Sequence, residues 1–226
     1  MGKRQEIKNK RQQKVKKQQI TVLIIVVGIA LLISGFVIYQ SIKPVGDIKS
    51  LEPRNHPQAD GLALGDPTAK IVVEEFSDFQ CVACFRFWQN SETEFIDKYV
   101  STGDVYFKYS PFSFIGEESF QASEAAFCAN DQGNFWEYHD MLFGNWTGEN
   151  IGNFNNNRLV AFAKSIGLNE GDFKSCLNSN KYDSEVKQRN VYGNQNNVSA
   201  TPSFIVNGQL VYSDALFSTI DALLTK

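Results

Sequence analysis

The segment "FSDFQCVACFRFW", residues 76–88, holds two cysteines separated by two residues at the end of an apolar run. The run itself, "KIVVEEFS" from Lys70, is short and rich in β-branched and aromatic residues, as in a buried strand. After the cysteines come a helical pattern, the break "STGD" and a second strand pattern, "VYFKYS". This order predicts a strand-helix-strand unit with parallel strands and the cysteines in its first turn. The predicted helix has one apolar face, made of Phe85, Trp88, Phe95 and Tyr99.

The rest of the chain predicts an α/β fold. Residues 116–190 carry four helical patterns separated by Gly and Asn clusters. "TPSFIVNGQLVYS", residues 201–213, indicates a β-hairpin that turns at Asn207-Gly208. The C-terminal segment predicts a helix capped by Asp214.

The N-terminus predicts a membrane anchor. Residues 1–19 hold eight Lys or Arg and one Glu, and residues 20–39 hold no charged residue. We expect residues 20–40 to cross the bilayer as one helix. Because Lys and Arg prefer the cytoplasmic side, residues 1–19 should form a cytoplasmic tail, with residues 41–226 outside the cell membrane. The alternative is a cleaved signal peptide, which would also export the domain.

The remaining chain predicts an acidic extracytoplasmic domain. Without residues 1–19 the sequence has 14 basic and 24 acidic residues, a balance of -10, which argues against nucleic acid as a partner. Residues 41–64 are rich in Pro, Gly and charge and are interpreted as a tether with a few residues packing onto the domain, in which His56 is a solvated residue. The folded domain is expected over residues 65–226.

Cys81 and Cys84 favour redox chemistry over the other uses of a cysteine pair. Zinc sites usually combine two close pairs, whereas the other two cysteines lie 48 residues apart, so no metal is expected. A permanent bond between Cys81 and Cys84 would close a very short loop and stabilise little. At a helix N-terminus, however, Cys81 can exist as a thiolate, the species that attacks disulfides. We predict Cys81 as the nucleophile and Cys84 as the thiol that closes the internal disulfide.

The two remaining cysteines, Cys128 and Cys176, are interpreted as a structural disulfide in the helical segment. Closing a loop of this length would stabilise the fold by about 4 kcal/mol by chain entropy. The alternative is two buried thiols.

Three further titratable residues could serve the site. Glu74 and Glu75 interrupt an apolar strand, and alternation points one of them into the interior, where burial would raise its pKa and let it exchange a proton with the inner thiol. The alternative places both at a strand edge in water. His139 shares a helical stripe with aromatic residues and is interpreted as a packed core histidine.

From about Gly65 to the C-terminus, the chain resembles the membrane-anchored branch of the DsbA-like thiol-disulfide oxidoreductases. The resemblance is carried by "GDPTAKIVVEEFSDFQCVACF", "SEAAFCANDQGNFWEYHDMLF", "FAKSIGLNEGDFKSC" and "SATPSFIVNG". It implies a thioredoxin fold with a helical domain inserted at about residues 113–198, and no cofactor. It also implies roles for particular residues: Glu75 rather than Glu74 as the buried acid, Thr201 and a cis Pro202 beside the disulfide and binding substrate, and Cys128 and Cys176 as a structural disulfide.

The function that this resemblance implies is oxidation of cysteine pairs in other exported proteins by a membrane-tethered enzyme. Such an oxidase needs a membrane redox partner, for which a quinone-coupled protein is a candidate, and a monomer is expected. Relatives often place Pro or His between the two cysteines, whereas this chain has Val82 and Ala83, so the helix terminus should supply most of the thiolate's stabilisation. The alternatives are a disulfide reductase or isomerase, and a peptide-binding module without redox turnover.

Overall fold

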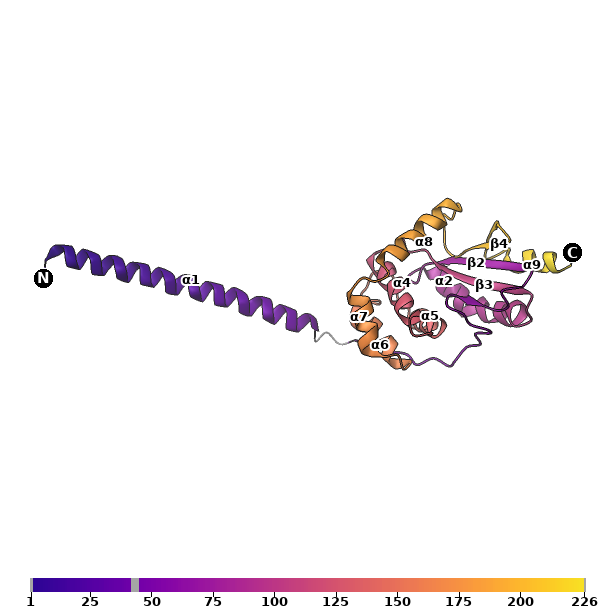
Figure 1. The fold of residues 1–226 in the computed structure, drawn as a ribbon, viewed down its shortest axis with the longest axis horizontal. Helices are drawn as coiled ribbons and strands as arrows, with labels where there is room; N and C mark the ends of the chain where they lie inside the picture. The colour runs from indigo at the N-terminus through magenta and orange to yellow at the C-terminus, as the bar shows by residue number, and fades with distance from the viewer. Residues whose placement is uncertain (1, 42–44, 226) are drawn as a thin grey trace. The chain divides into compact units, whose positions relative to one another are not determined.

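The computed structural model describes residues 2–41 and 45–225, which form two units divided after Pro44. The first unit is a single helix, α1 (Lys3–Ser41), so the basic tail and the apolar segment are one continuous element (Figure 1). Residues Lys16–Phe36 are long and apolar enough to cross a membrane, and none of this stretch is buried within the structure.

The second unit contains a five-stranded sheet with the strand order β1-β3-β2-β4-β5. β2 and β3 are parallel, as predicted, whereas the other neighbouring strands are antiparallel. The predicted hairpin is also present: Asn207 and Gly208 both adopt the positive φ that its tight turn requires. The strands are β1 (Ala63–Leu64), β2 (Ile71–Ser77), β3 (Val105–Pro111), β4 (Ser203–Val206) and β5 (Gln209–Tyr212).

The helical run after the cysteines contains two wide π-helical turns. It consists of α2 (Val82–Phe87), η1 (Trp88–Glu92), α3 (Thr93–Phe95) and η2 (Ile96–Val100). Each wide turn shifts the helical phase, because it inserts a residue relative to a regular α-helix. The predicted apolar face is therefore buried only in its second half: Phe95 and Tyr99 lie in the core, whereas Phe85 and Trp88 are half-buried.

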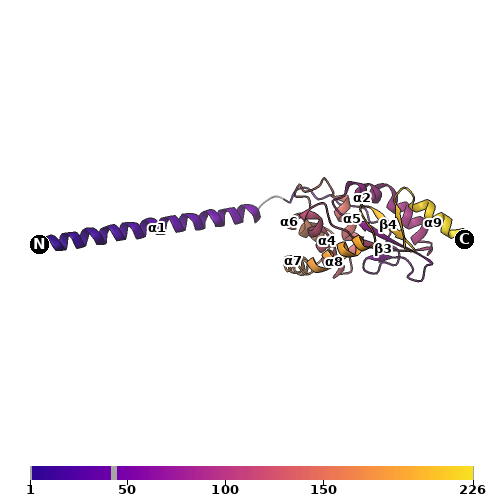
Figure 2. The ribbon, with the colours of Figure 1, turned by 90° about the horizontal axis from the view of Figure 1, so that it is seen from above.

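Five helices lie between β3 and β4 and form the inserted helical domain. They gather beside the sheet in both views, with α9 (Leu216–Leu224) on the other side of it (Figure 1, Figure 2). The sequence predicted a helix at the C-terminus, but α9 begins at Leu216, so Asp214 lies in the preceding turn instead of capping it. The inserted helices are α4 (Glu117–Asn130), α5 (Phe135–Gly144), α6 (Asn156–Ser165), α7 (Glu170–Asn178) and α8 (Asp183–Gln195).

Residues 45–62, which we call the arm, belong to the compact unit, whereas only a few residues of the predicted tether were expected to pack onto the domain. Lys49 exchanges two hydrogen bonds with Asn145, at 2.7 and 3.2 Å. Arg54 donates to Glu92 at 2.9 Å and to the Trp88 carbonyl at 2.8 Å. These contacts are made by polar side chains, and no periodic pattern in the sequence reveals them.

Candidate active site

Cys81 occupies the turn between β2 and α2. It is the N-cap of α2, with extended backbone angles, and its N–H donates to the Asp78 carbonyl at 2.9 Å. Only 8% of Cys81 is exposed, and Cys84, one helical turn inside, is 1% exposed. The sequence therefore placed both cysteines correctly at the start of the helix, and Cys81 is the more accessible of the two.

Two buried residues before Cys81 fix the shape of this turn, and the sequence analysis missed both. The Asp78 carboxylate accepts from the backbone N–H groups of Gln80, Phe114 and Ile115 at 2.8 to 3.1 Å. The Gln80 side chain accepts from the Asn150 N–H at 2.6 Å, so both residues tie the turn to loops of the helical domain. Polar residues within an apolar stretch, as in "SDFQC", are the signal that could have indicated them.

The pKa of the Cys81 thiol is lowered to about 6. The largest cause is hydrogen bonding from the Cys84 thiol, and burial acts in the opposite direction. The Thr201 hydroxyl and the backbone N–H groups of Cys84 and Ala83 contribute further to the lowering. The Cys84 thiol is therefore the largest single contributor, and the N–H groups of the helix terminus add to it.

The pKa of the Cys84 thiol is shifted in the opposite direction. Burial raises its pKa well above the ordinary value, and its hydrogen bond to Cys81 and the charges of Cys81 and Glu75 raise it further. At neutral pH the pair thus holds one thiolate at the outer position and one neutral thiol beneath it. This is the distribution that lets the outer sulfur attack or be attacked while the inner one retains its proton.

Glu75 is the more deeply buried of the two adjacent glutamates, 2% exposed against 9% for Glu74. Its Oε2 has no hydrogen-bond partner among the described residues. Burial raises its pKa to about 8, the Ser77 hydroxyl opposes the rise, and the charge of Cys81 adds to it. Glu74, by contrast, accepts a hydrogen bond from the Tyr192 hydroxyl at 3.0 Å. Glu75 is therefore the carboxyl that shares its electrostatic environment with the cysteines.

The Thr201–Pro202 peptide bond is cis and lies against Cys81. The Thr201 carbonyl oxygen is 3.4 Å from the Cys81 Sγ. β4 begins directly afterwards, at Ser203, which pairs with Phe76 of β2. The sheet therefore holds the cis bond beside the reactive sulfur.

Cys128 and Cys176 form a disulfide that joins α4 to α7, with the two Cα atoms 5.8 Å apart. In the part of the chain that the structure describes, the free thiols are Cys81 and Cys84.

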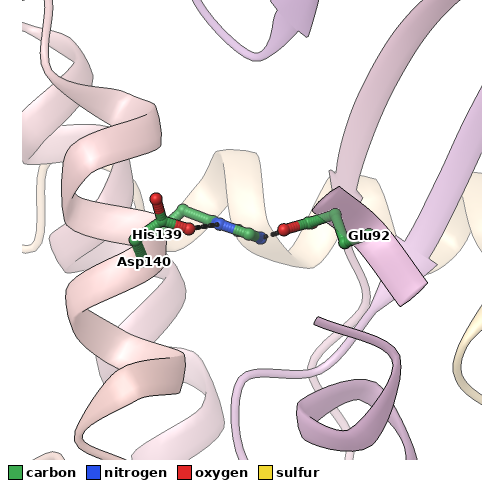
Figure 3. A group of neighbouring side chains, drawn as sticks. All are labelled: Glu92, His139 and Asp140. Atoms are coloured by element: carbon green, nitrogen blue, oxygen red, sulfur yellow. Dashed lines mark hydrogen bonds and ion pairs between the residues drawn. The ribbon is translucent and has the colours of Figure 1, made fainter. Parts of the chain in front are cut away.

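Three buried titratable side chains, Glu92, His139 and Asp140, lie together near the arm (Figure 3). Their potential ligand atoms lie within 4.8 Å of one another, the spacing of a metal site. However, the Arg54 guanidinium lies 2.9 Å from Glu92 and 3.5 Å from Asp140, so a permanent cation already faces both carboxyl groups. We therefore assign no metal to this group.

The structure agrees with the predicted environment of one histidine, His139, but not with that of the other, His56. His139 packs edge-on against Tyr109, with ring centroids 4.8 Å apart, and is a core histidine as interpreted. The interpretation of His56 as a solvated residue is wrong, because its Nε2 lies 3.0 Å from Asp140 and its side chain is 10% exposed.

We predict that Glu75→Gln removes a pH-dependent loss of stability. Between about pH 4.5 and 8 the unfolded chain releases the Glu75 proton while the folded protein retains it, so the free energy of unfolding falls as pH rises, by about 1.4 kcal/mol per unit of pKa difference. Urea unfolding of both proteins at pH 4.5 and pH 8, with the Cys81–Cys84 disulfide closed, measures this. The two cysteines do not titrate in the closed disulfide, so their coupling to Glu75 does not enter the comparison. A difference between wild type and variant that does not change with pH would contradict the prediction.

Comparison with known proteins agrees with this geometry. Residues 58–226 match the family described as Thioredoxin. The chain is 27% identical to the probable disulfide bond formation protein D of Bacillus cereus over 219 residues, which cover 94% of this chain and 100% of the relative. It is also 27% identical to the disulfide bond formation protein D of Bacillus subtilis over 170 residues, covering 72% and 75% of the two chains.

Solved structures show the same similarity. BdbD from Bacillus subtilis, in its oxidised form, superposes with a TM-score of 0.68 and 25% identity over 76% of this chain and 98% of that one. Chlamydia trachomatis DsbA shares the fold, with a TM-score of 0.64 and 22% identity over 77% and 98% of the two chains. The chain therefore belongs to the thioredoxin family, as a DsbA-like thiol-disulfide oxidoreductase. The predicted thioredoxin fold with an inserted helical domain is confirmed.

Proposed function

We propose that this protein is a membrane-tethered oxidase that forms disulfides in exported proteins through its Cys81-Val82-Ala83-Cys84 centre. The observation that carries the proposal is the contrast between the acidic Cys81 thiol and the neutral, buried Cys84 thiol. A stabilised thiolate favours the reduced enzyme. The disulfide form is correspondingly a strong oxidant.

The proposed cycle moves one disulfide from the enzyme to the substrate. A substrate thiolate attacks Cys81, the Cys81–Cys84 bond breaks, and Cys84 leaves with the electron pair and takes a proton from Glu75. A second substrate thiolate then attacks the mixed disulfide, so that the substrate leaves with its disulfide and Cys81 remains as a thiolate. Thr201 and Pro202 would hold the substrate's backbone beside Cys81 during these steps.

The remaining assignments concern the enzyme's location and partners. We infer that residues 20–40 anchor it in the cell membrane, that residues 1–19 stay in the cytoplasm, and that the compact unit lies outside. The exposed apolar side chains of α1 support this anchor. The reduced enzyme would return its two electrons to a membrane redox partner, of which a quinone-coupled protein is one kind, and would act as a monomer.

Two other functions are separable from this one. A reductase or isomerase is favoured by Val82 and Ala83, whose side chains offer no hydrogen bond to the Cys81 thiolate. A peptide-binding module would use Thr201 and Pro202 without redox turnover.

The test is the reduction potential of the full chain in detergent, equilibrated in glutathione buffers, together with the pH dependence of Cys81 alkylation. We expect a potential above about -180 mV and an alkylation midpoint near pH 6. A potential near -270 mV with a midpoint near about 7 would favour the reductase instead. The pH dependence of Cys81 alkylation in the Cys84→Ala variant separates the contributions of the inner thiol and of the helix terminus to the stability of the thiolate. This variant lacks the inner thiol but keeps the helix terminus.

A further inference from the structure

A row of titratable side chains runs from the interior of the compact unit to its surface. It begins at Glu92, whose Oε1 lies 3.6 Å from the His139 Nε2 (Figure 3). The His139 Nδ1 lies 3.3 Å from the Asp140 Oδ1, and the Asp140 Oδ2 lies 3.0 Å from the His56 Nε2. The His56 Nδ1 is 3.8 Å from Glu137, whose side chain is half exposed. Each member of the row is close enough to its neighbour for a small movement to bring them into hydrogen-bond distance.

The outer end of the row opens into a cavity of about 150 Å³ between the arm and α5. Its lining includes His56, Asp140, Glu137 and Arg54. Apolar residues, among them Leu51 and Met141, line the rest of the cavity. Liquid water takes about 30 Å³ per molecule, so a cavity of this size has room for several waters beside the polar side chains. Protons that reach His56 or Asp140 therefore have access to solvent.

The inner end of the row, Glu92 and His139, lies near Glu75 and Tyr109, because the charge of Glu75 acts on Glu92 and the Tyr109 ring contacts His139. Glu75 and Tyr109 are register partners on β2 and β3, and the Tyr109 ring packs edge-on against His139. Three buried polar atoms in this region, the Glu75 Oε2, the Tyr109 Oη and the His139 Nε2, have no hydrogen-bond partner within residues 2–41 and 45–225. Buried polar atoms are normally paired, so three unpaired ones in one region call for a role.

The protonation states along the row provide alternating hydrogen-bond donors and acceptors. Burial, followed by the charges of Asp140 and Glu75, raises the pKa of Glu92 well above its usual range, so its carboxyl can donate. Burial lowers the pKa of His139, which leaves a neutral ring that can accept at Nε2 and donate at Nδ1. Burial alone would raise the pKa of Asp140, but His139 and His56 hold it below its usual range, so this carboxylate accepts.

We propose that a proton relay connects Glu75 to the cavity beneath the arm, through Glu92, His139, Asp140 and His56. This inference rests on the proposed role of Glu75 as the group that exchanges a proton with Cys84. When a mixed disulfide at Cys81 closes, the Cys84 sulfur bonds to the Cys81 sulfur and the partner leaves as a thiolate with the electron pair. Glu75 releases its own proton through the relay to water and takes up the Cys84 proton in its place. When the Cys81–Cys84 disulfide is reduced, a proton moves along the same residues in the opposite direction, from water to Glu75.

Arg54 stabilises the relay without carrying protons itself. Its guanidinium stays charged at all relevant pH values and donates to Glu92. The alternative reading of the whole group is a static ion network that only holds the arm to η1. The two readings differ in one observable, because a static network influences stability but not the rate at which a proton leaves Cys84.

The test follows closure of a mixed disulfide in a single turnover. Reduced full chain in detergent is mixed with excess oxidised glutathione, quenched with acid and analysed by mass, which separates formation of the Cys81–glutathione adduct from its closure by Cys84. In His56→Ala and in His139→Phe we expect adduct formation at the wild-type rate and closure slower by about tenfold or more. His56→Ala also enlarges the cavity, so added imidazole should restore closure in proportion to its concentration.

Glu74→Gln is the matched control, because Glu74 is a carboxyl of the same strand whose partner is Tyr192. This control should close at the wild-type rate. The relay is overturned if both relay variants close within about twofold of wild type, or if closure is slow but insensitive to imidazole and its solvent deuterium isotope effect is unchanged. His56 belongs to the arm, whereas His139 is fully buried in the core, so His56→Ala tests the relay even if His139→Phe does not fold. If wild type forms no adduct at Cys81, it is the proposed function that fails.

Discussion

Replacing Cys84 by Ser is expected to leave Cys81 joined to its substrates as stable mixed disulfides and to abolish disulfide formation. The reason is geometric: Cys84 is the only thiol close enough to displace a substrate from Cys81 among the residues that the structure describes. Ser cannot form a disulfide but keeps nearly the same volume in a site that is almost fully buried. The substrate is a protein that already contains a disulfide, which the Cys81 thiolate attacks, so that one substrate sulfur joins Cys81 and the other leaves as a thiolate. The adducts are detected by mass spectrometry and by gel shift on reduction.

Cys81→Ser is the matched control for this experiment. It retains Cys84, but burial and a raised pKa keep that thiol neutral, so no adduct should accumulate. A binding module without redox turnover would behave differently: Cys84→Ser would form no adduct and would bind peptides as well as wild type. That outcome would exclude the oxidoreductase cycle proposed here.

Removing the Cys128–Cys176 disulfide is expected to lower the free energy of unfolding by about 4 kcal/mol. The bond spans 48 residues, and opening it returns that loop to the full conformational freedom of an unfolded chain. It also joins α4 to α7, whose neighbours form much of the helical domain. Urea unfolding of Cys128→Ala/Cys176→Ala against wild type, under oxidising conditions, measures the loss.

Unfolding under reducing conditions supplies the control. Reduction opens the Cys128–Cys176 bond of the wild type, which the variant lacks, so the difference in stability between the two proteins should largely disappear. A difference below about 1 kcal/mol under oxidising conditions would mean that apolar packing alone holds α4 and α7 together. The redox centre should retain its alkylation behaviour in the double variant, since neither cysteine contributes to the pKa of Cys81.

The sequence predicted the elements whose signals are local. β2 and β3, the helical run between them and the hairpin at Asn207-Gly208 each depend on periodicity or turn chemistry within a short window. The π-helical turns and the packed arm were not predictable in this way. Both depend on contacts between distant residues, such as Arg54 with the Trp88 carbonyl.

In the candidate site, too, the features with a local sequence signal were predicted, and those that depend on distant contacts were not. The spacing of Cys81 and Cys84 is visible in the sequence, whereas the choice of Glu75 over Glu74 required a family resemblance. Strand alternation alone left the two glutamates equivalent, and the distinction comes from the Tyr192 hydroxyl, 118 residues away, which binds Glu74. Asp78 and Gln80 escaped notice because their partners belong to loops of the inserted helical domain.

The arm has a practical consequence for anyone who prepares this enzyme without its anchor. The family match begins at residue 58, and a fragment designed from that boundary would omit Arg54 and His56. It would remove Arg54 from the Glu92 carboxyl group, His56 from the Asp140 carboxyl group, and the hydrogen-bond donor from the Trp88 carbonyl. A soluble form should therefore start at Val45, where the compact unit begins. In shorter fragments, the helical run that follows the cysteines would lack its contacts with Arg54, and the measured activity would be that of an altered site.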